Sequence, residues 1–440
     1  MALDLSFDST AAGMAADGAQ ADALYRRLTW RIAPFLCLGF LAAYVDRVNV
    51  GFAKLRMAAD LGLGEAAYGL GAGLFFVGYV LCEVPSNILL QRVGARFWLA
   101  RIMLTWGVVS GAMCLVHTPM AFYALRLLLG VAEAGFMPGA LLYLSQWFPP
   151  ERRGRLTALF MIGIPLSSVL GAPLSGFILA HFSGVGGIAG WRWLFAVESL
   201  PPVLLGLWAL FGLPDRIETA DWLDAREKGF LRGQLRHGHD DHAISRLWQA
   251  FADPRVWHVG LIDGAILLGL YTVAFWFPTF LKGRGVADPM TIGLITMVPH
   301  LCAVFSMVLN GWHSDRTGER RLHVVLPVLL GAFLLGCSVL ADGSLAVSVC
   351  LIALANAAIL GALPPFWCIP ANFLRGPAAA AGLAIACSFA NLAGFFATGI
   401  IGWTIQRTHS PDLALVLFAC VMAAAALSLF LIPREIVDRA

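Results

Sequence analysis

The sequence predicts an all-α membrane protein with twelve transmembrane helices in two pseudo-symmetric six-helix halves. Of its 440 residues, 59% are hydrophobic and only 13% are charged, whereas a soluble domain carries about 25% charged residues. The mean hydropathy is +0.77. So few polar residues could not cover a soluble protein of this size, and disorder requires low hydrophobicity. A membrane helix needs about 20 apolar residues, so twelve of them would use roughly 240 residues.

Twelve apolar runs follow one another along the chain, separated by charged or turn-rich breaks. The expected spans are 31–51, 68–90, 97–116, 120–148, 156–181, 192–213, 256–281, 290–312, 322–341, 345–372, 379–405 and 412–432. The long polar stretch after the sixth span divides the chain. We expect a disordered tail at 1–25, an N-terminal half at 26–213, a linker at 214–253, a C-terminal half at 254–433 and a tail at 434–440.

The basic residues indicate how the chain is oriented. If the N-terminus is cytoplasmic, twenty-two of the thirty Lys and Arg residues fall in cytoplasmic loops and tails and six fall outside. Because cytoplasmic loops carry an excess of Lys and Arg, this bias predicts a multi-pass protein of the inner membrane with both termini in the cytoplasm. The first 25 residues have no apolar core that would make them a signal peptide.

The two halves also share a short sequence repeat. Arg92, Gly94 and Arg96 follow the second span, and Asp315, Arg316 and Gly318 follow the eighth span, 224 residues after the equivalent glycine. Each segment predicts a tight cytoplasmic turn, for which glycine supplies the conformational freedom. Parallel six-span halves are typical of secondary transporters, whose substrate site lies between the halves. We therefore expect these six residues to act in gating.

Ionisable residues inside a membrane span are functional candidates by default. They are Asp46, Arg47, Glu83, Arg126, Glu133, Glu198 and Asp263. One interpretation is a buried charge network that only fixes helix packing. The other is an anion site, because the arginine fork fits a carboxylate and makes Arg47 and Arg126 substrate-binding candidates. A substrate that claims an arginine would free a nearby carboxyl group to take up a proton, which makes Asp46 and Glu133 candidates for proton coupling.

The remaining polar residues of the spans are harder to interpret. Glu83, near the cytoplasmic end of its span, is expected to close an intracellular gate or cap a helix, and Glu198 is expected to be structural. Asp263 could be a second proton site or face a water-filled vestibule. The aromatic and amide candidates for substrate contact are Tyr44, Tyr79, Trp367 and Asn391. The alternative for the aromatic residues is packing or an interfacial belt.

The sequence lacks the motifs of several other function classes. It contains no nucleotide-binding GxxxxGK[ST] segment, no HExxH and no Cys/His cluster with metal-ligand spacing. We therefore expect no enzyme activity, no metal and no cofactor, the proton being the coupling ion. A net charge of +3 is too small to suggest nucleic acid. The expected partners are a small organic anion and the lipid bilayer, with the protein functional as a monomer.

A set of longer motifs resembles a known family. The motifs are Tyr44-Val-Asp46-Arg47-Val-Asn49-Val-Gly51, Glu83-Val-Pro85-Ser86-Asn87, Arg126-Leu-Leu-Leu-Gly130-Val-Ala-Glu133, Phe275-Trp276-Phe-Pro278-Thr and Ser314-Asp315-Arg316-Thr-Gly318. Together they resemble the anion:cation symporter family of the major facilitator superfamily. The resemblance runs from residue 26 to 433 and is greatest to its tartrate transporter and 4-hydroxyphenylacetate permease branch, and extends to sugar-acid:proton symporters.

The resemblance implies the major facilitator fold and proton-coupled import of a small organic anion by alternating access. The substrate would be a tartrate-like hydroxy-dicarboxylate, an aromatic carboxylate or a sugar acid. It implies functional charges at Asp46, Arg47, Arg126 and Glu133, and substrate contacts from Tyr44, Tyr79, Trp367 and Asn391. Sugar-acid members carry a glutamine where this chain has Ile164, which suggests a substrate with fewer hydroxyl groups.

Two other functions stay open at this point. An exchanger or exporter of the same fold is the first alternative, because Gly171-Ala-Pro173 partly matches the glycine-proline motif of drug antiporters. A transporter-like receptor that senses an anion without moving it is the second.

Overall fold

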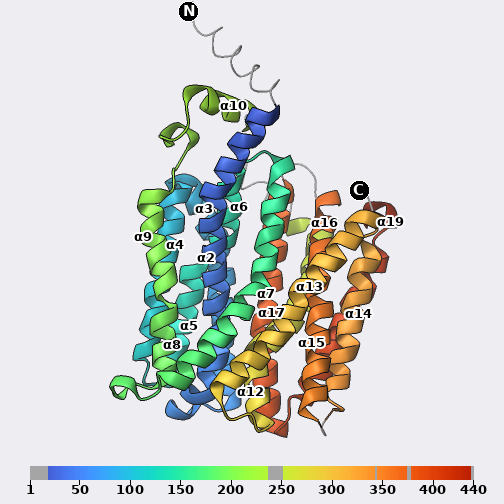
Figure 1. Ribbon diagram of the computed structural model, residues 1–440. Coiled ribbons are helices and arrows are strands. Elements are labelled where there is room, and N and C mark those ends of the chain that lie inside the picture. The colour runs from blue at the N-terminus through green and yellow to red at the C-terminus, as the bar shows by residue number, and fades with distance from the viewer. Residues whose placement is uncertain (1–17, 236–250, 342–343, 374–377, 438–440) are drawn as a thin grey trace, which may run out of the picture.

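The computed structural model describes residues 18–235, 251–341, 344–373 and 378–437, and these residues form helices and no strand. Twelve helical spans are long and apolar enough to cross a membrane (Figure 1). The predicted all-α class and the number and order of the spans are confirmed. Hydrocarbon offers no partner for a polar backbone group, so each span has to satisfy its hydrogen bonds internally as a helix.

In the N-terminal half, four of the six spans are single helices and two are interrupted. The helices are α2 (Gly18–Asp60), α3 (Glu65–Val93), α4 (Ala95–Ala112), α5 (Pro119–Glu133) with α6 (Phe136–Ser145), α7 (Pro150–His181), and α8 (Gly190–Glu198) with α9 (Leu200–Gly212). Among the single helices, α7 runs unbroken through Pro165 and Pro173. The fourth span breaks at Gly135, whose φ of +89° lies in the left-handed region that glycine tolerates.

The C-terminal half repeats this arrangement. Its helices are α12 (Pro254–Gly283), α13 (Pro289–Thr317), α14 (Arg321–Ser338), α15 (Leu345–Gly361) with α16 (Leu363–Phe373), α17 (Ala378–Thr408) and α18 (Asp412–Ser428). The tenth span is interrupted between α15 and α16, as the fourth is between α5 and α6. Short helices α10 (Ala225–Leu235) and α19 (Arg434–Val437) lie in the predicted linker and C-terminal tail.

The predicted N-terminal tail needs a correction, because residues 18–25 are not disordered but begin α2. Tyr25 is 5% exposed and its ring lies 6.1 Å from that of Phe148 and 6.2 Å from that of Phe230. This start of α2 is too polar to count as a membrane span, but α7 and α10 lie beside it and protein covers its apolar face. Residues 1–17 of the predicted tail and 236–250 of the linker lie outside the described residues.

The two halves stand side by side, with the start of α2, α10 and α19 at the same end of the bundle (Figure 1). We call this end the termini side and the other end the opposite side. The halves meet where α3 packs on α17, α7 on α13, and α2 on α12. On the opposite side α3 and α17 approach so closely that a Cβ on Gly69 would lie 2.4 Å from the Thr398 carbonyl oxygen.

A second close approach holds α7 against α13 on the same side. A Cβ on Gly293 would lie 2.5 Å from the Ala172 carbonyl oxygen, and one on Gly176 would lie 2.6 Å from that of Pro289. Small residues at such crossings let helix backbones pack directly. The structure is therefore a conformation in which the halves are closed together on the opposite side.

Candidate functional site

The centre of the site is an ion pair between Arg47 of α2 and Glu133, the last residue of α5. Both side chains are buried, at 4% and 1% exposure. The Arg47 guanidinium also lies 4.8 Å from the centre of the Tyr44 ring and 5.0 Å from that of Tyr79, and a third ring, Phe75, lies 5.2 Å away. Aromatic faces attract a cation most strongly where water is absent. The cation is thus held by one carboxylate and three rings.

Arg126 of α5 is fully buried but only partly hydrogen-bonded. Its Nη2 donates to the Ala72 carbonyl at 3.0 Å, and its Nε and Nη1 have no partner among the described residues. Buried donors without a partner are costly and rare in native proteins. Two free donors on one guanidinium suit a carboxylate ligand, which can accept both.

Asp46 neighbours Arg47 in sequence but lies in different surroundings. It accepts hydrogen bonds from Ser110 of α4 and, at 3.4 Å, from Asn49. It interacts electrostatically with Arg126, yet the two form no ion pair among the described residues. The sequence grouped two acids and two arginines in one polar cavity. The structure brings all four together but joins only Arg47 and Glu133 directly.

The C-terminal half contributes an aromatic and amide face. The Tyr271 hydroxyl of α12 donates to Asn391 Oδ1 of α17 at 3.0 Å, and Asn391 Nδ2 donates to the Cys387 carbonyl at 2.9 Å. Tyr271 interacts electrostatically with Arg47 across the two halves. Sequence reasoning missed Tyr271, although it stands in a buried apolar run where a hydroxyl needs a partner. Trp367 of α16 is half-buried and packs against Phe366, with ring centres 5.5 Å apart.

Three further acids of the spans are buried. Glu83 of α3 accepts a hydrogen bond from Ser388 of α17, which links the two halves. This contact lies one turn beyond Tyr79 toward the termini side, and the gating role of Glu83 stays a prediction. Asp263 of α12 is 2% exposed, its Oδ1 has no partner among the described residues, and it interacts electrostatically with Tyr44 and Tyr271. Glu198 of α8 accepts from Ser175 Oγ at 2.8 Å.

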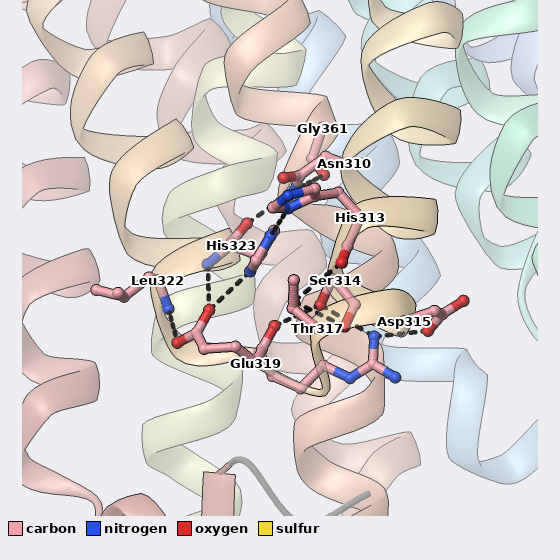
Figure 2. Close-up of polar contacts among 10 residues, drawn as sticks. Asn310, His313, Ser314, Asp315, Thr317, Glu319, Leu322, His323 and Gly361 are labelled. Atoms are coloured by element: carbon pink, nitrogen blue, oxygen red, sulfur yellow. Dashed lines mark hydrogen bonds and ion pairs between the residues drawn. The ribbon is translucent and has the colours of Figure 1, made fainter.

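Figure 2 shows the turn between α13 and α14, one of the two repeated turn motifs. Gly318 ends α13 with a φ of +68°, and Asp315 forms an ion pair with Arg320 at 2.6 Å. Beyond the turn, His323 connects His313, at 2.6 Å, with Glu319, at 2.7 Å. The side chain of Arg316 is exposed and lies over the Trp312 ring. The turn is thus built by local contacts.

The equivalent turn of the N-terminal half is built differently. Gly94, with a φ of +102°, separates α3 from α4, and the Arg96 backbone N–H donates to Asp215 Oδ1 at 3.2 Å. Asp215 belongs to the linker, so this turn is tied to the segment that joins the halves. Arg92 is exposed. The repeat therefore predicted the two turns and their glycines, but not their different partners.

A cluster that sequence reasoning missed closes the opposite side. Lys54 of α2 forms an ion pair with Glu65 at 2.5 Å, and its Nζ lies 3.9 Å from the centre of the Trp276 ring of α12. Lys282 of α12 donates to the Leu55 carbonyl of α2 at 2.5 Å. Lys54 is one of the six basic residues that the charge distribution places outside. Its 4% exposure could not be expected from its place just beyond an apolar run.

The family model of the Major Facilitator Superfamily matches residues 36–398. The chain belongs to this superfamily. It is 48% identical to the putative metabolite transport protein NicT of Pseudomonas putida, over 95% of this chain and 96% of the relative. It is 45% identical to a putative tartrate transporter of Agrobacterium vitis (93% and 91%) and 37% identical to a quinolone resistance transporter of Acinetobacter baumannii (90% and 92%).

Solved major facilitator structures share the fold at low identity. The xylose transporter XylE of E. coli in a partially occluded inward open conformation aligns with a TM-score of 0.70 at 17% identity, covering 92% of this chain and 98% of the other. A bacterial homolog of the lysosomal transporter Spinster, inward-facing and occupied, gives 0.71 at 16% identity (91% and 96%). The relatives are named as transporters, so this major facilitator protein is a membrane transporter and not an enzyme.

The major facilitator family explains why the site lies where it does. Its two halves are related across an axis along the membrane normal, and the site lies at their interface near mid-depth. In this chain, Arg47 and Glu133 of the N-terminal half face Tyr271 and Asn391 of the C-terminal half. Among the residues that the structure describes, no group of three His, Cys, Asp or Glu could hold a metal ion.

Proposed function

We propose that this transporter is a proton-coupled symporter of the inner membrane, with both termini in the cytoplasm. It imports a small organic anion across that membrane into the cytoplasm by alternating access. The observation that carries the proposal is the pairing of Arg47 with Glu133 beside an incompletely bonded Arg126. The relatives named as putative tartrate transporters support a small carboxylate as substrate. The protein acts as a monomer, with the proton as its coupling ion.

The coupling follows from the cost of burying charge. In the structure Glu133 neutralises Arg47, and two donors of Arg126 have no partner among the described residues. A substrate carboxylate that binds these arginines competes with Glu133 for Arg47. A carboxylate left without its cation in a low-dielectric site is costly, and protonation removes this cost. Substrate binding and proton uptake therefore favour each other, with Asp46 as the second acid beside Arg126.

The substrate class follows from the side chains around the arginines. Tyr44, Tyr79 and Trp367 offer ring faces, and Asn391 offers an amide. Ile164 is buried and apolar at the position where the resemblance implies a glutamine in sugar-acid members. The substrate we propose is a tartrate-like hydroxy-dicarboxylate or an aromatic carboxylate, with sugar acids disfavoured.

An exchanger or exporter of organic anions is the second candidate. The observation that favours it is the 37% identity to a relative named as a quinolone resistance transporter. The two candidates differ in the direction in which protons move. On substrate addition a symporter acidifies the compartment that substrate enters, whereas a proton-driven exporter makes the compartment that substrate leaves acidic.

The test is uptake of radiolabelled tartrate, a sugar acid and 4-hydroxyphenylacetate into proteoliposomes. A pH gradient should drive uptake of at least one of them, with acidification of the lumen. Glu133→Gln and Asp46→Asn should abolish the gradient-driven uptake and leave exchange at equal pH on both sides. The control is Asp412→Asn, which changes an acid in the first turn of α18, far from the arginines. Unchanged gradient-driven uptake in both site variants would refute the coupling.

A further inference from the structure

One buried acid of the N-terminal half lies away from Arg47 and Arg126. It is Glu198, the last residue of α8, which is 4% exposed. Its Oε1 accepts a hydrogen bond from Ser175 Oγ of α7 at 2.8 Å, and its Oε2 has no partner among the described residues. A carboxyl group in the interior of a membrane protein is costly unless it is paired or functional. Of the ion pairs found in the described part of the chain, none includes Glu198.

Asn49 of α2 connects Glu198 to Asp46. Its Nδ2 donates to Asp46 Oδ1 at 3.4 Å, and its side chain also interacts with the Glu198 carboxylate. The two carboxyl groups interact electrostatically with each other. Ser110 and Ser175 complete the row as neutral donors, one at each end. A continuous polar chain thus crosses the interior of the N-terminal half from α4 through α2 and α8 to α7.

This row of polar side chains has fewer hydrogen-bond donors than acceptors. Asp46 Oδ2, Asn49 Oδ1 and Glu198 Oε2 are all buried acceptors, and none has a partner in the described structure. Two carboxylates that interact electrostatically beside one shared amide in a low-dielectric interior cannot both be ionised at low cost. A carboxyl proton relieves both problems, because its O–H group donates to one of the unsatisfied acceptors. This row of polar side chains can therefore hold a proton.

The chain also leads toward the opposite side of the membrane. Asp46, Asn49 and Glu198 lie 14, 11 and 8 residues from the opposite-side ends of their helices, which corresponds to ~21, ~16 and ~12 Å. Those two ends lie at the same level, because Trp191 Nε1 of α8 donates to Asp60 Oδ2 of α2 at 2.6 Å. Glu198 is thus the acid of the chain nearest to that side. The central path between the halves is closed there by Gly69, Thr398 and the Lys54 cluster.

We propose that Glu198 is a proton-transfer residue that exchanges the coupling proton with Asp46, on a route through the N-terminal half that is separate from the substrate path. This proposal rests on the proposed proton coupling. The O–H bond of the Glu198 carboxyl group breaks and an O–H bond forms on the Asp46 carboxylate. Glu198, left ionised, then takes a proton from water on the opposite side. The two transfers together move one proton from that side to Asp46; hydronium in the water loses the proton and becomes water, and no other reactant is needed.

The experiment compares two kinds of transport in the same proteoliposomes. Glu198→Gln keeps the shape and hydrogen-bonding capacity of the side chain but cannot carry a proton. Because positioned groups accelerate proton transfer by about 10²–10⁴-fold, we expect uptake driven by a pH gradient to fall at least tenfold. Exchange of labelled for unlabelled substrate at equal pH needs no net proton release and should stay within about threefold of wild type.

Two further variants separate proton transfer from packing. Glu198→Asp retains a carboxyl group and should restore much of the gradient-driven uptake. Ser175→Ala removes the hydrogen bond to Glu198 but no titratable group, and should retain coupling. If Ser175→Ala loses gradient-driven uptake as fully as Glu198→Gln, or if Glu198→Gln lowers exchange and gradient-driven uptake equally, Glu198 is a packing residue and the proposal is wrong.

Two last outcomes complete the test. If Glu198→Gln fails to insert into the membrane, Asn49→Val is the second variant, because it leaves both carboxyl groups and removes the amide between them. It should give the same selective loss of gradient-driven uptake. Retention of that uptake in Asn49→Val overturns the proposal. A wild-type protein that shows no gradient-driven uptake refutes the proposed symport itself. If the gradient drives uptake by the wild type, Asp46→Asn loses this uptake and Glu198→Gln retains it, only the role of Glu198 is refuted.

Discussion

Replacing Gly402 of α17 by alanine should push the transporter out of the conformation described here. A Cβ at this position would lie 2.4 Å from the Glu65 carbonyl oxygen of α3 and 3.2 Å from the Gly69 Cα. The first distance is about 1 Å short of ordinary van der Waals contact, and both neighbours are backbone, which cannot rotate away. Overpacking of this kind costs about 1–3 kcal/mol. Because the strain exists only while the opposite side is closed, the equilibrium should shift about 5–150-fold toward the conformation open on that side.

The assay is the distance between two spin labels on the termini side. Val93 at the end of α3 and Thr317 at the end of α13 are both exposed, and labels there, in a background without native cysteines, should move closer in Gly402→Ala. Gly399→Ala is the matched control, because it lies one turn away on α17 and its Cβ would meet nothing within 4 Å. Both changes raise helix propensity equally. Equal distance distributions for the two variants would refute the steric reasoning.

Three other substitutions test the charges and the pocket. Arg47→Lys keeps the charge but loses the planar fork that binds a carboxylate, so substrate affinity in exchange assays should fall at least about tenfold; unchanged affinity would exclude a direct contact. Lys54→Met removes the ion pair with Glu65 and the cation over Trp276, and the latter contact is worth about 2 kcal/mol when desolvated. The conformation closed on the opposite side should lose stability, so the same spin labels should move closer together. A distance distribution like that of wild type would show that Lys54 does not stabilise this closure. Ile164→Gln should raise uptake of a sugar acid relative to tartrate, and a constant ratio would show that this position does not select substrate.

The sequence was sufficient to predict the fold because lipid imposes a simple condition on it. Each span needs a continuous run of apolar residues, and such runs are visible without any tertiary information. The ends of the helices were less predictable. The start of α2 is polar, and it is helical because Tyr25 packs on Phe148 and Phe230, two residues far away in the sequence. Protein rather than lipid covers this segment, and hydropathy does not detect that.

The site was predicted residue by residue but not in its pairings. Arg126 and Glu133 are two turns apart on α5 and share a face, yet Glu133 pairs with Arg47 of α2. Glu133 is the last residue of α5, two residues before the break at Gly135, and its carboxylate meets Arg47 of α2 there. Contacts between helices that are distant in the sequence, such as Lys54 with Trp276 and Tyr271 with Asn391, join residues 120 or more positions apart, and the spacing of a single sequence carries no signal for them.

The buried charges are distributed very unequally between the two halves. Among the described residues, every buried Asp, Glu, Lys or Arg except Asp263 belongs to the N-terminal half. A charge that has to stay paired through a large rearrangement is best paired within one rigid body, because separating buried partners is strongly destabilising. The Arg47–Glu133 pair and the chain from Asp46 to Glu198 satisfy this condition. The C-terminal half meets them with rings, an amide and Ser388, whose contacts can be broken and remade in each cycle at modest cost. This division predicts that proton coupling resides in the N-terminal half, and that substitutions on the facing surface of the C-terminal half change substrate preference before they change coupling.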